Sequence, residues 1–274
     1  MKIKKYNLSK QAVALSVSVL MSVLRMADAQ AASISNGSLI INLDRNALIE
    51  GTILDNTPAP SIYVEEFWDA SAANKTFLQL RDENTPVNIM DYQANEILAM
   101  GLQYAVNGAD IPANPGARQN RATDFSFDPN DLFGSASGGI GLNGVIRFRV
   151  DVNQPTNRVL LGDMTLEYHP ELEGASLGRS GWLMVNHIGF DADAFELFDV
   201  NTNLTANNLT LSGNLGFGWG FDHLGSGVAR QNNTRIGTFS FETAVVPVPA
   251  SVWLFVSGLA GILRFRLNKG KTQI

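Results

Sequence analysis

The stretch Ile146-Arg-Phe-Arg-Val-Asp-Val152 sets the pattern for the body of the chain. Apolar residues alternate with charged ones: Ile146, Phe148, Val150 and Val152 on one side, Arg147, Arg149 and Asp151 on the other. Because successive side chains of a β-strand point to opposite faces, a period of two predicts a strand. We expect one face of this strand to be buried and the arginine face to be wet.

The same alternation recurs along the chain, at residues 163–168 and 238–242. Residues 38–43, 182–188, 195–200 and 208–211 are further candidate strands, separated by segments rich in Gly, Asn and Asp that suit turns. The best helix candidate is residues 92–106, with Asp91 as N-cap, and a second short helix is expected near residues 62–70. The sequence therefore predicts a mainly β fold: an antiparallel, jelly-roll-like β-sandwich with one or two short helices.

The N-terminus has the layout of a secretory signal peptide. Four lysines (Lys2, Lys4, Lys5 and Lys10) precede an apolar run at residues 12–24, which is too short to span a bilayer. The small-x-small pattern of a signal peptidase site then occurs twice, ending at Ala29 and at Ala31. We expect cleavage after Ala31, so that residues 1–31 are the signal peptide and Ala32 begins the mature protein.

The C-terminus carries a second targeting pattern. The segment Val246-Pro247-Val248-Pro249-Ala250 precedes an apolar run at residues 252–263, and Arg264 and Arg266 follow. The two prolines favour an extended segment, and the arginines indicate a cytoplasmic end. Twelve apolar residues make about 18 Å of helix, shorter than the roughly 30 Å hydrocarbon core, so we expect a transient membrane helix. The alternative is an amphipathic tail that packs on the protein or lies at the membrane surface.

The sequence VPVPASVWLFVSGLAGILRFR resembles the PEP-CTERM family of exosortase substrates. Val248 stands where the family name has glutamate, which places the motif in the VPxPA variant. The body segments GDMTLEYHP, GRSGWLMVNHIGFDADAFEL and LTLSGNLGFGWG are similar to bodies found on some PEP-CTERM proteins, a likeness that implies no known activity. We expect three parts: the signal peptide (1–31), a β-sandwich ectodomain (32–243) and a sorting tail (244–274).

The resemblance implies an exported protein of a Gram-negative, exopolysaccharide-producing bacterium. Its partners would be signal peptidase, the inner membrane and an exosortase that processes the chain near Val246, Pro247, Val248, Pro249 and Ala250. It would reside transiently in the inner membrane and then at the cell surface, in the outer membrane or in the extracellular matrix, with a link to exopolysaccharide and biofilm. The chain itself is then expected to be a substrate and not an enzyme.

Charge and cysteine content narrow the other classes. Between residue 31 and the tail beyond Val246 the chain has 11 basic and 25 acidic residues, a net charge of −14, compared with −6 for the whole chain. Such a surface repels nucleic acid, so we expect no nucleic-acid partner. The absence of cysteine excludes disulfides and thiolate metal sites, so the stability of an exported domain must come from its core.

Two alternatives come from other functional classes. In a strand, Phe217, Trp219 and Phe221 would share one face, and an exposed aromatic row of this kind could stack on sugar rings, as in a carbohydrate-binding module. The competing interpretation is that these rings fill the core. A glycan-acting enzyme could use paired carboxylates such as Glu167 with Glu171 or Glu173, although acid pairs are expected by chance in so acidic a domain.

We expect no resident cofactor or metal. The oxygen-rich segment with Asp124, Asp128, Asn130 and Asp131 is a weak Ca²⁺ candidate, and turn or capping chemistry explains it equally well. The three histidines, His169, His187 and His223, lack a short ligand spacing. The G-x-G-x-x-G spacing at residues 139–144 precedes a predicted strand, whereas a dinucleotide site needs a helix there, so it predicts a loop that enters a strand.

Overall fold

The computed structural model describes residues 31–54, 57–58, 62–88, 91–110, 114–150, 158–223 and 228–247. Residues Ser33–Val246 form one compact unit. The fold is mainly β with few short helices, as the sequence predicts. In the described ranges no helix is long and apolar enough to cross a membrane. The predicted C-terminal membrane helix and most of the signal peptide lie outside these ranges.

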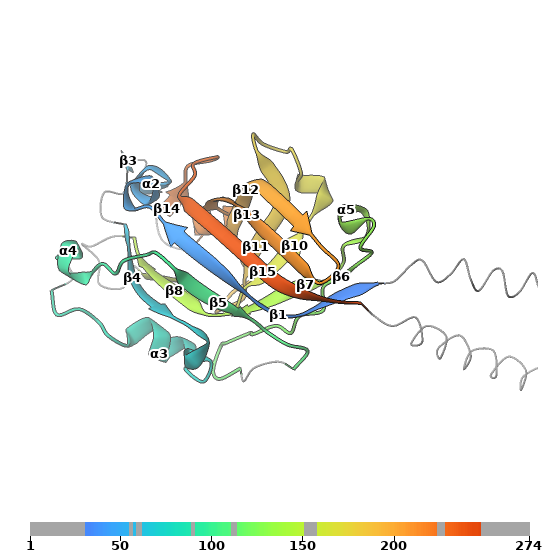
Figure 1. The fold of residues 1–274 in the computed structure, drawn as a ribbon. Coiled ribbons are helices and arrows are strands. Elements are labelled where there is room, and N and C mark those ends of the chain that lie inside the picture. Colours follow the sequence, from blue (N-terminus) through green and yellow to red (C-terminus); the bar gives the residue numbers. More distant parts are fainter. Residues whose placement is uncertain are drawn as a thin grey trace, which may run out of the picture. The chain divides into compact units, whose positions relative to one another are not determined.

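The largest sheet closes on itself into an eight-stranded barrel. Neighbouring strands follow the order β15-β13-β12-β11-β10-β7-β5-β1, and β1 pairs with β15, which lies beside it in Figure 1. The strands are β1 (Ala32–Leu43), β5 (Leu102–Val106), β7 (Gly139–Asn143), β10 (Thr165–Tyr168), β11 (Arg179–Asn186), β12 (Ala192–Leu204), β13 (Asn208–Phe217) and β15 (Gly237–Pro247). The prediction of a two-sheet sandwich is therefore wrong, because pairing of the first and last strands removes the free edges that a sandwich would keep.

A second sheet continues from two strands of the barrel. It has the order β4-β8-β9, with β4 (Tyr63–Trp68), β8 (Val145–Arg149) and β9 (Arg158–Gly162). β7 continues into β8 through Gly144, at φ +152°, and β9 continues into β10 through Asp163, at φ +50°. The ribbon that pairs β7 with β10 in the barrel thus bends and pairs β8 with β9 outside it.

Both predicted helices are largely wrong. Residues 92–106 form only a short helix, α4 (Tyr92–Asn95), followed by the barrel strand β5. The N-cap prediction is confirmed, since the Asp91 carboxylate accepts the backbone N–H of Ala94. Gly101, at φ +71°, separates the two elements, and pairing with β1 overrides the helical propensity of residues 102–106. The region 62–70 contains strand β4 (Tyr63–Trp68) rather than a helix, and Ala70 begins η2.

The remaining elements are short. A small sheet combines β14 (Val228–Arg230), β2 (Thr52–Leu54) and β3 (Thr57–Pro58), and β6 (Ser126–Phe127) lies beside β1. The helices and turns are α2 (Arg45–Glu50), η2 (Ala70–Ala72), α3 (Phe77–Asp82), α5 (Leu132–Ser135), η3 (Pro170–Leu172) and η4 (Trp219–His223). Side-chain caps begin several of them, and a full capping box at Thr76 and Gln79 starts α3.

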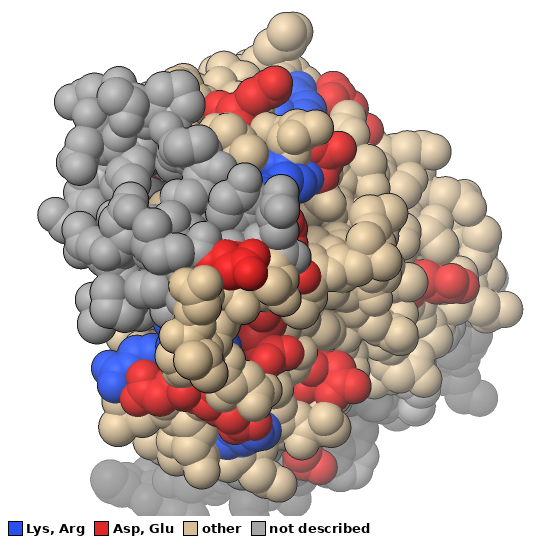
Figure 2. Space-filling model, turned by 90° about the vertical axis from the view of Figure 1, so that its left-hand side faces the viewer, with Lys and Arg blue, Asp and Glu red and all other residues tan. Residues whose placement is uncertain are grey.

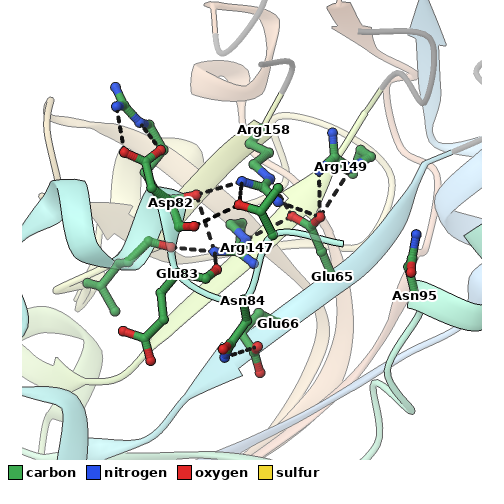
Figure 3. A network of polar contacts seen from close by, with 12 residues as sticks. Glu65, Glu66, Asp82, Glu83, Asn84, Asn95, Arg147, Arg149 and Arg158 are labelled. Atoms are coloured by element: carbon green, nitrogen blue, oxygen red, sulfur yellow. Dashed lines mark hydrogen bonds and ion pairs between the residues drawn. The ribbon is translucent and has the colours of Figure 1, made fainter. Parts of the chain in front are cut away.

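The arginine face of β8 is buried, so the predicted wet face is wrong. Arg147 and Arg149 are 0% exposed, and both bind the carboxylate of Glu65 on the neighbouring strand β4 (Figure 3). Arg147 donates from Nε at 2.8 Å and Arg149 from Nη2 at 2.6 Å, while Arg158 on β9 donates from Nη2 at 2.8 Å. The buried Glu65 on β4 thus links its own strand to the arginines of β8 and β9. We call these four residues the Glu65 cluster.

The outer guanidinium atoms of this cluster cap a helix. Nη1 of Arg147 donates to the carbonyl oxygens of Leu80 and Glu83, at 2.6 and 2.8 Å, and Arg158 donates to that of Arg81 at 2.9 Å. These carbonyls lie at the C-terminal end of α3, where backbone oxygens lack intrahelical partners and a cation is favoured. The cluster therefore also fixes α3 against the second sheet.

Charge decides the ionisation of Glu65. Burial by itself raises the pKa of this carboxyl, but hydrogen bonds from Arg158 and Arg149 and the charges of Arg147 and Arg149 outweigh it, so the pKa lies below its usual value. Burial likewise lowers the pKa of Arg147, and the Glu65 charge opposes this. The Glu65 carboxyl is therefore ionised near neutral pH.

A second buried pair fastens the loop before β6 to the bend between the two sheets. Arg118 is 4% exposed and Asp163 is 0% exposed. Nε of Arg118 lies 2.8 Å from Oδ2 of Asp163, Nη2 lies 2.6 Å from Oδ1, and the backbone N–H of Gln119 donates to Oδ2 at 3.0 Å. The loop that carries Arg118 is thereby held on the outer wall of the barrel.

Candidate functional site

The outer wall of the barrel contains a hollow of about 560 Å³ over strands β7 and β10. Most of its lining residues have polar side chains, and they come from the loop before β6, the start of β7, β10 and the end of β11: Arg121, Ala122, Asp124, Ser137, Gly138, Gly139, Thr165, Glu167, Tyr168, His169 and His187. This volume is within the range of small-molecule sites.

Two glycines of β7 explain how the hollow forms. A Cβ atom on Gly141 would lie 2.0 Å from the carbonyl oxygen of Arg121, so the covering loop can approach only a glycine here. A Cβ atom on Gly139 would lie 3.4 Å from side-chain atoms of both Thr165 and Glu167, and its absence leaves space above them. The G-x-G spacing is therefore a packing feature inside a strand, and not the loop expected from the sequence.

A continuous chain of hydrogen bonds crosses the wall of this hollow. Asp191 Oδ1 lies 2.6 Å from Nδ1 of His187, whose Nε2 lies 2.8 Å from the Thr165 hydroxyl oxygen. That hydroxyl donates to Oε1 of Glu167 at 2.6 Å. Oε2 of Glu167 lies 3.1 Å from Nε2 of His169, whose Nδ1 lies 3.0 Å from Oε1 of Glu171. We call these six residues, Asp191, His187, Thr165, Glu167, His169 and Glu171, the histidine chain.

The register of β10 and β11 assembles the chain. Thr165 pairs with Val185 and Glu167 with Leu183, so outward side chains of the two strands lie side by side. Glu167 and His169 are two positions apart along one strand direction and point to the same side. The sequence separation of the two histidines concealed this arrangement; the alternation of Thr165, Glu167 and His169 was the signal that could have pointed to it.

Neighbouring carboxylates shift the pKa of His169, near one end of the histidine chain. Burial lowers the pKa of His169, but hydrogen bonds with Glu167 and Glu171 outweigh it, so the pKa is raised overall. The backbone N–H of Glu171 and the His169 ring lower the pKa of the Glu171 carboxyl. Next to them, burial and a hydrogen bond to Glu173 raise the pKa of Tyr168 to about 12.

Asp191, His187 and Thr165 have the spacing of a nucleophile triad, but the hydrogen-bond directions differ from one. The single hydrogen of the Thr165 hydroxyl goes to Glu167. While that hydrogen is on the Glu167 side, Nε2 of His187 is the donor to the hydroxyl oxygen, whereas a catalytic base would accept the hydroxyl proton.

The predicted aromatic row is not an exposed face. Phe217 and Phe221 are 4% and 0% exposed and stack on each other with ring centroids 3.8 Å apart, while Trp219 is 45% exposed. The strand β13 ends at Phe217 and the chain turns into η4, which breaks the alternation. Phe217 also packs against Phe195 and Phe148. The alternative in which all three rings stack on a sugar is therefore wrong for Phe217 and Phe221, which belong to the core as the competing interpretation expects.

The weak Ca²⁺ candidates are engaged in local hydrogen bonds. Asp124 accepts the backbone N–H of Gly139 at 2.8 Å, Asp128 accepts that of Asn130 at 2.8 Å, and Asp131 caps α5 by accepting the N–H of Gly134 at 3.0 Å. Among the residues that the structure describes, no group of three or more His, Asp or Glu side chains is arranged to hold a metal ion.

The other predicted pairs are brought together in part. His169 lies between Glu167 and Glu171, and Glu173 accepts the hydroxyl of Tyr168. His169 and His187 line the same hollow, and His223 belongs to η4.

The surface keeps the acidic excess of the sequence. The buried Arg, Asp and Glu residues of the described ranges are three arginines and three acids: Arg118, Arg147, Arg149, Glu65, Asp163 and Glu196. Burial of these side chains therefore removes equal numbers of each sign from the surface. On the face shown in Figure 2, acidic side chains are spread over the described surface with a few Lys and Arg side chains among them.

Both ends of the compact unit lie at one end of the barrel. The Thr243 hydroxyl of β15 donates to the carbonyl oxygen of Asn36 in β1, which places the start of β1 beside the end of β15. Of the predicted sorting residues, Val246 and Pro247 end β15, and Val248, Pro249, Ala250, Arg264 and Arg266 lie outside the described residues. Ala29 also lies outside them, and Ala31 immediately precedes β1.

Comparisons with protein-family models, with curated proteins and with solved structures returned no match.

Proposed function

We propose that this chain is an exported protein whose C-terminal tail is processed by an exosortase. The observation that carries the proposal is the order of the tail: the VPVPA segment from Val246 to Ala250, an apolar run at residues 252–263, and then Arg264 and Arg266. This order places a rigid recognition segment beside a membrane helix that ends in a cytoplasmic stop. The basic and apolar N-terminal segments supply the export signal.

The shape of the body supports this proposal in two ways. The compact unit begins at Ser33, two residues after the expected signal peptidase site, and ends at Val246, where the motif begins. Its two ends lie side by side on β1 and β15. Both targeting segments would therefore join the same end of the barrel, which lets either one be cut without passing through the fold.

The body itself would be an acidic, non-catalytic ectodomain released at the cell surface, in the outer membrane or in the exopolysaccharide matrix. With a net charge of −14 between the two targeting segments, it is soluble and repelled by anionic surfaces.

The test is the mass of the mature protein. The full chain is produced in a Gram-negative host with its exosortase, recovered from the cell exterior and measured intact. We expect a chain that begins at Ala32 and has lost the residues after the VPVPA segment. An intact C-terminus on exterior material would refute processing, and a retained N-terminus would refute the signal peptide.

A double variant makes the test specific. Pro247→Ala with Pro249→Ala should leave the apolar run attached and the protein in the membrane fraction. Pro86→Ala, a substitution of the same kind within the body, should be processed as the natural chain is. Equal processing of both variants would show that the motif is not read.

A further inference from the structure

The histidine chain contains more hydrogen-bond acceptors than it has hydrogens when both histidines are neutral. Three of its members are carboxylates, which when ionised can only accept. The Thr165 hydroxyl has one hydrogen, and Glu167 receives it at 2.6 Å. Every other contact in the chain therefore needs a hydrogen from a ring nitrogen.

Counting those contacts fixes the state of the two rings. His169 faces Glu167 through Nε2 and Glu171 through Nδ1, so each nitrogen must carry a hydrogen. His187 faces the Asp191 carboxylate through Nδ1 and the hydroxyl oxygen of Thr165 through Nε2. With the Thr165 hydrogen on the Glu167 side, each ring carries a hydrogen on both nitrogens, and the charged members of the histidine chain alternate in sign from Asp191 to Glu171.

The groups that surround the rings favour these charges. Glu167 on β10 and Glu171 in η3 contact His169 directly, and the charge of Asp193 on β12 also interacts with it. On the loop side, Asp124 and Arg121 line the same hollow, one of each sign. His187 has Asp191 as its ionic partner. Because carboxylates are in excess around the rings, every contact of the histidine chain has a hydrogen only when each ring carries two protons.

We propose that the histidine chain is a pH-sensitive latch, in which two imidazolium ions hold η3 and the turn at Asp191 against the barrel wall and release them as the pH rises. Each ring that loses a proton keeps one donor for two acceptors. The outer partners, Glu171 and Asp191, have side chains 66% and 59% exposed, so water replaces these contacts at the lowest cost. The inner contacts to Thr165 and Glu167 are retained.

Each half of the latch restrains a different segment. Glu171 belongs to η3, within the connection between β10 and β11. Asp191 lies in the connection between β11 and β12. The two connections flank β11, so deprotonation of both rings loosens both ends of this strand while the barrel remains closed. The latch extends beyond the proposed sorting function, and neither proposal depends on the other.

Hydrogen exchange of the full chain across pH 5.5 to 9.0 tests the latch, with rates corrected for the intrinsic effect of pH. We expect exchange at residues 170–178 and 188–191 to accelerate several-fold above the pH at which the rings titrate. His169→Gln should accelerate exchange at residues 170–178 at all pH values, and His187→Gln should do so at residues 188–191. His223→Gln is the matched control and should keep the natural pH dependence.

Nuclear magnetic resonance of the imidazole nitrogens provides a second measurement that does not depend on folding of the variants. At pH 5.5 both ring nitrogens of His169 and His187 should be protonated. The proposal is overturned if either ring is a neutral tautomer at that pH, or if exchange in both segments is independent of pH in the natural chain.

Discussion

The Glu65 cluster and the histidine chain each centre on one glutamate, but the two glutamates contact different cations. Glu65 is surrounded by three arginines, which keep their charge at any physiological pH. Glu167 is held by Thr165 and by His169, a residue that titrates near neutrality. In the first cluster Glu65, Arg147 and Arg149 are buried and the side chain of Arg158 is 5% exposed, whereas side chains of the second reach solvent. The permanent charges of the arginines fix the sheet β4-β8-β9, whereas the titratable charge of His169 lets η3 respond to pH.

The largest loss of stability is expected when Glu65, the carboxylate of the buried cluster, is removed. Glu65→Ala leaves three buried guanidinium groups without a carboxylate, which costs about 3 to 5 kcal/mol or prevents folding. For a domain of this size, that corresponds to a fall in Tm of roughly 10 °C. Thermal unfolding followed by circular dichroism measures it. Glu66→Ala, on the same strand and half-buried, is the control and should change Tm by only a degree or two; equal falls would contradict the role of Glu65.

The next effect concerns the Arg118–Asp163 pair. Arg118→Ala leaves Asp163 buried and without its ionic partner, and we expect a loss of about 3 kcal/mol in the free energy of unfolding. Urea denaturation measures this loss. Arg121→Ala is a matched control, since Arg121 is exposed in the same loop, and its effect should stay within about 0.5 kcal/mol.

A smaller effect separates the two regions by pH. Glu65 has a lowered pKa in the folded protein, so its contribution is present above the unfolded pKa of 4.5 and is lost in acid as the folded pKa is crossed. His169 has a raised pKa, so its contribution is complete below the unfolded pKa of 6.5 and is lost as the pH rises through the folded value. Urea denaturation at several pH values should show a loss below about 1 kcal/mol on the alkaline side, because His169 is partly exposed. His169→Gln should reduce that alkaline loss by the share that His169 contributes; an unchanged loss would assign it to another group.

The smallest effect is expected at the exposed end of the histidine chain. Glu171→Gln keeps an acceptor for His169 but removes the charge, so the pKa of His169 should fall toward its usual value while Tm hardly changes. Titration of the His169 ring by nuclear magnetic resonance measures the pKa. An unchanged pKa would leave Glu167 as the sole cause of the shift.

The alternation of apolar and polar residues correctly predicted β8, β10 and β15, because successive side chains of a strand point to opposite faces. Phe239 and Phe241 are buried and Ser240 and Glu242 are exposed, as expected for β15. The same reasoning was wrong for Arg147 and Arg149, because their partner Glu65 lies more than 80 residues earlier in the chain. A pattern along one strand contains no information about such a distant carboxylate.

The candidate site was harder to predict for a related reason. Its two histidines meet the same hollow only through the register of β10 with β11, and the hollow depends on the missing side chains of Gly139 and Gly141. The helix predicted at residues 92–106 shows a third limit: composition favours a helix, but Tyr104 pairs with Leu39 and becomes part of the barrel. Long-range pairing decides each of these cases.

The pairing of β1 with β15 also orders events in time. A hydrogen bond joins residues that are 207 positions apart, Asn36 and Thr243, so the ring cannot close until almost the whole body is present. Contacts of such long range make folding slow, because a long loop must be closed before they form. A chain made from its N-terminus therefore keeps an open edge on β1 through nearly all of its synthesis. The barrel can therefore close only after β15, its last strand, has been synthesised.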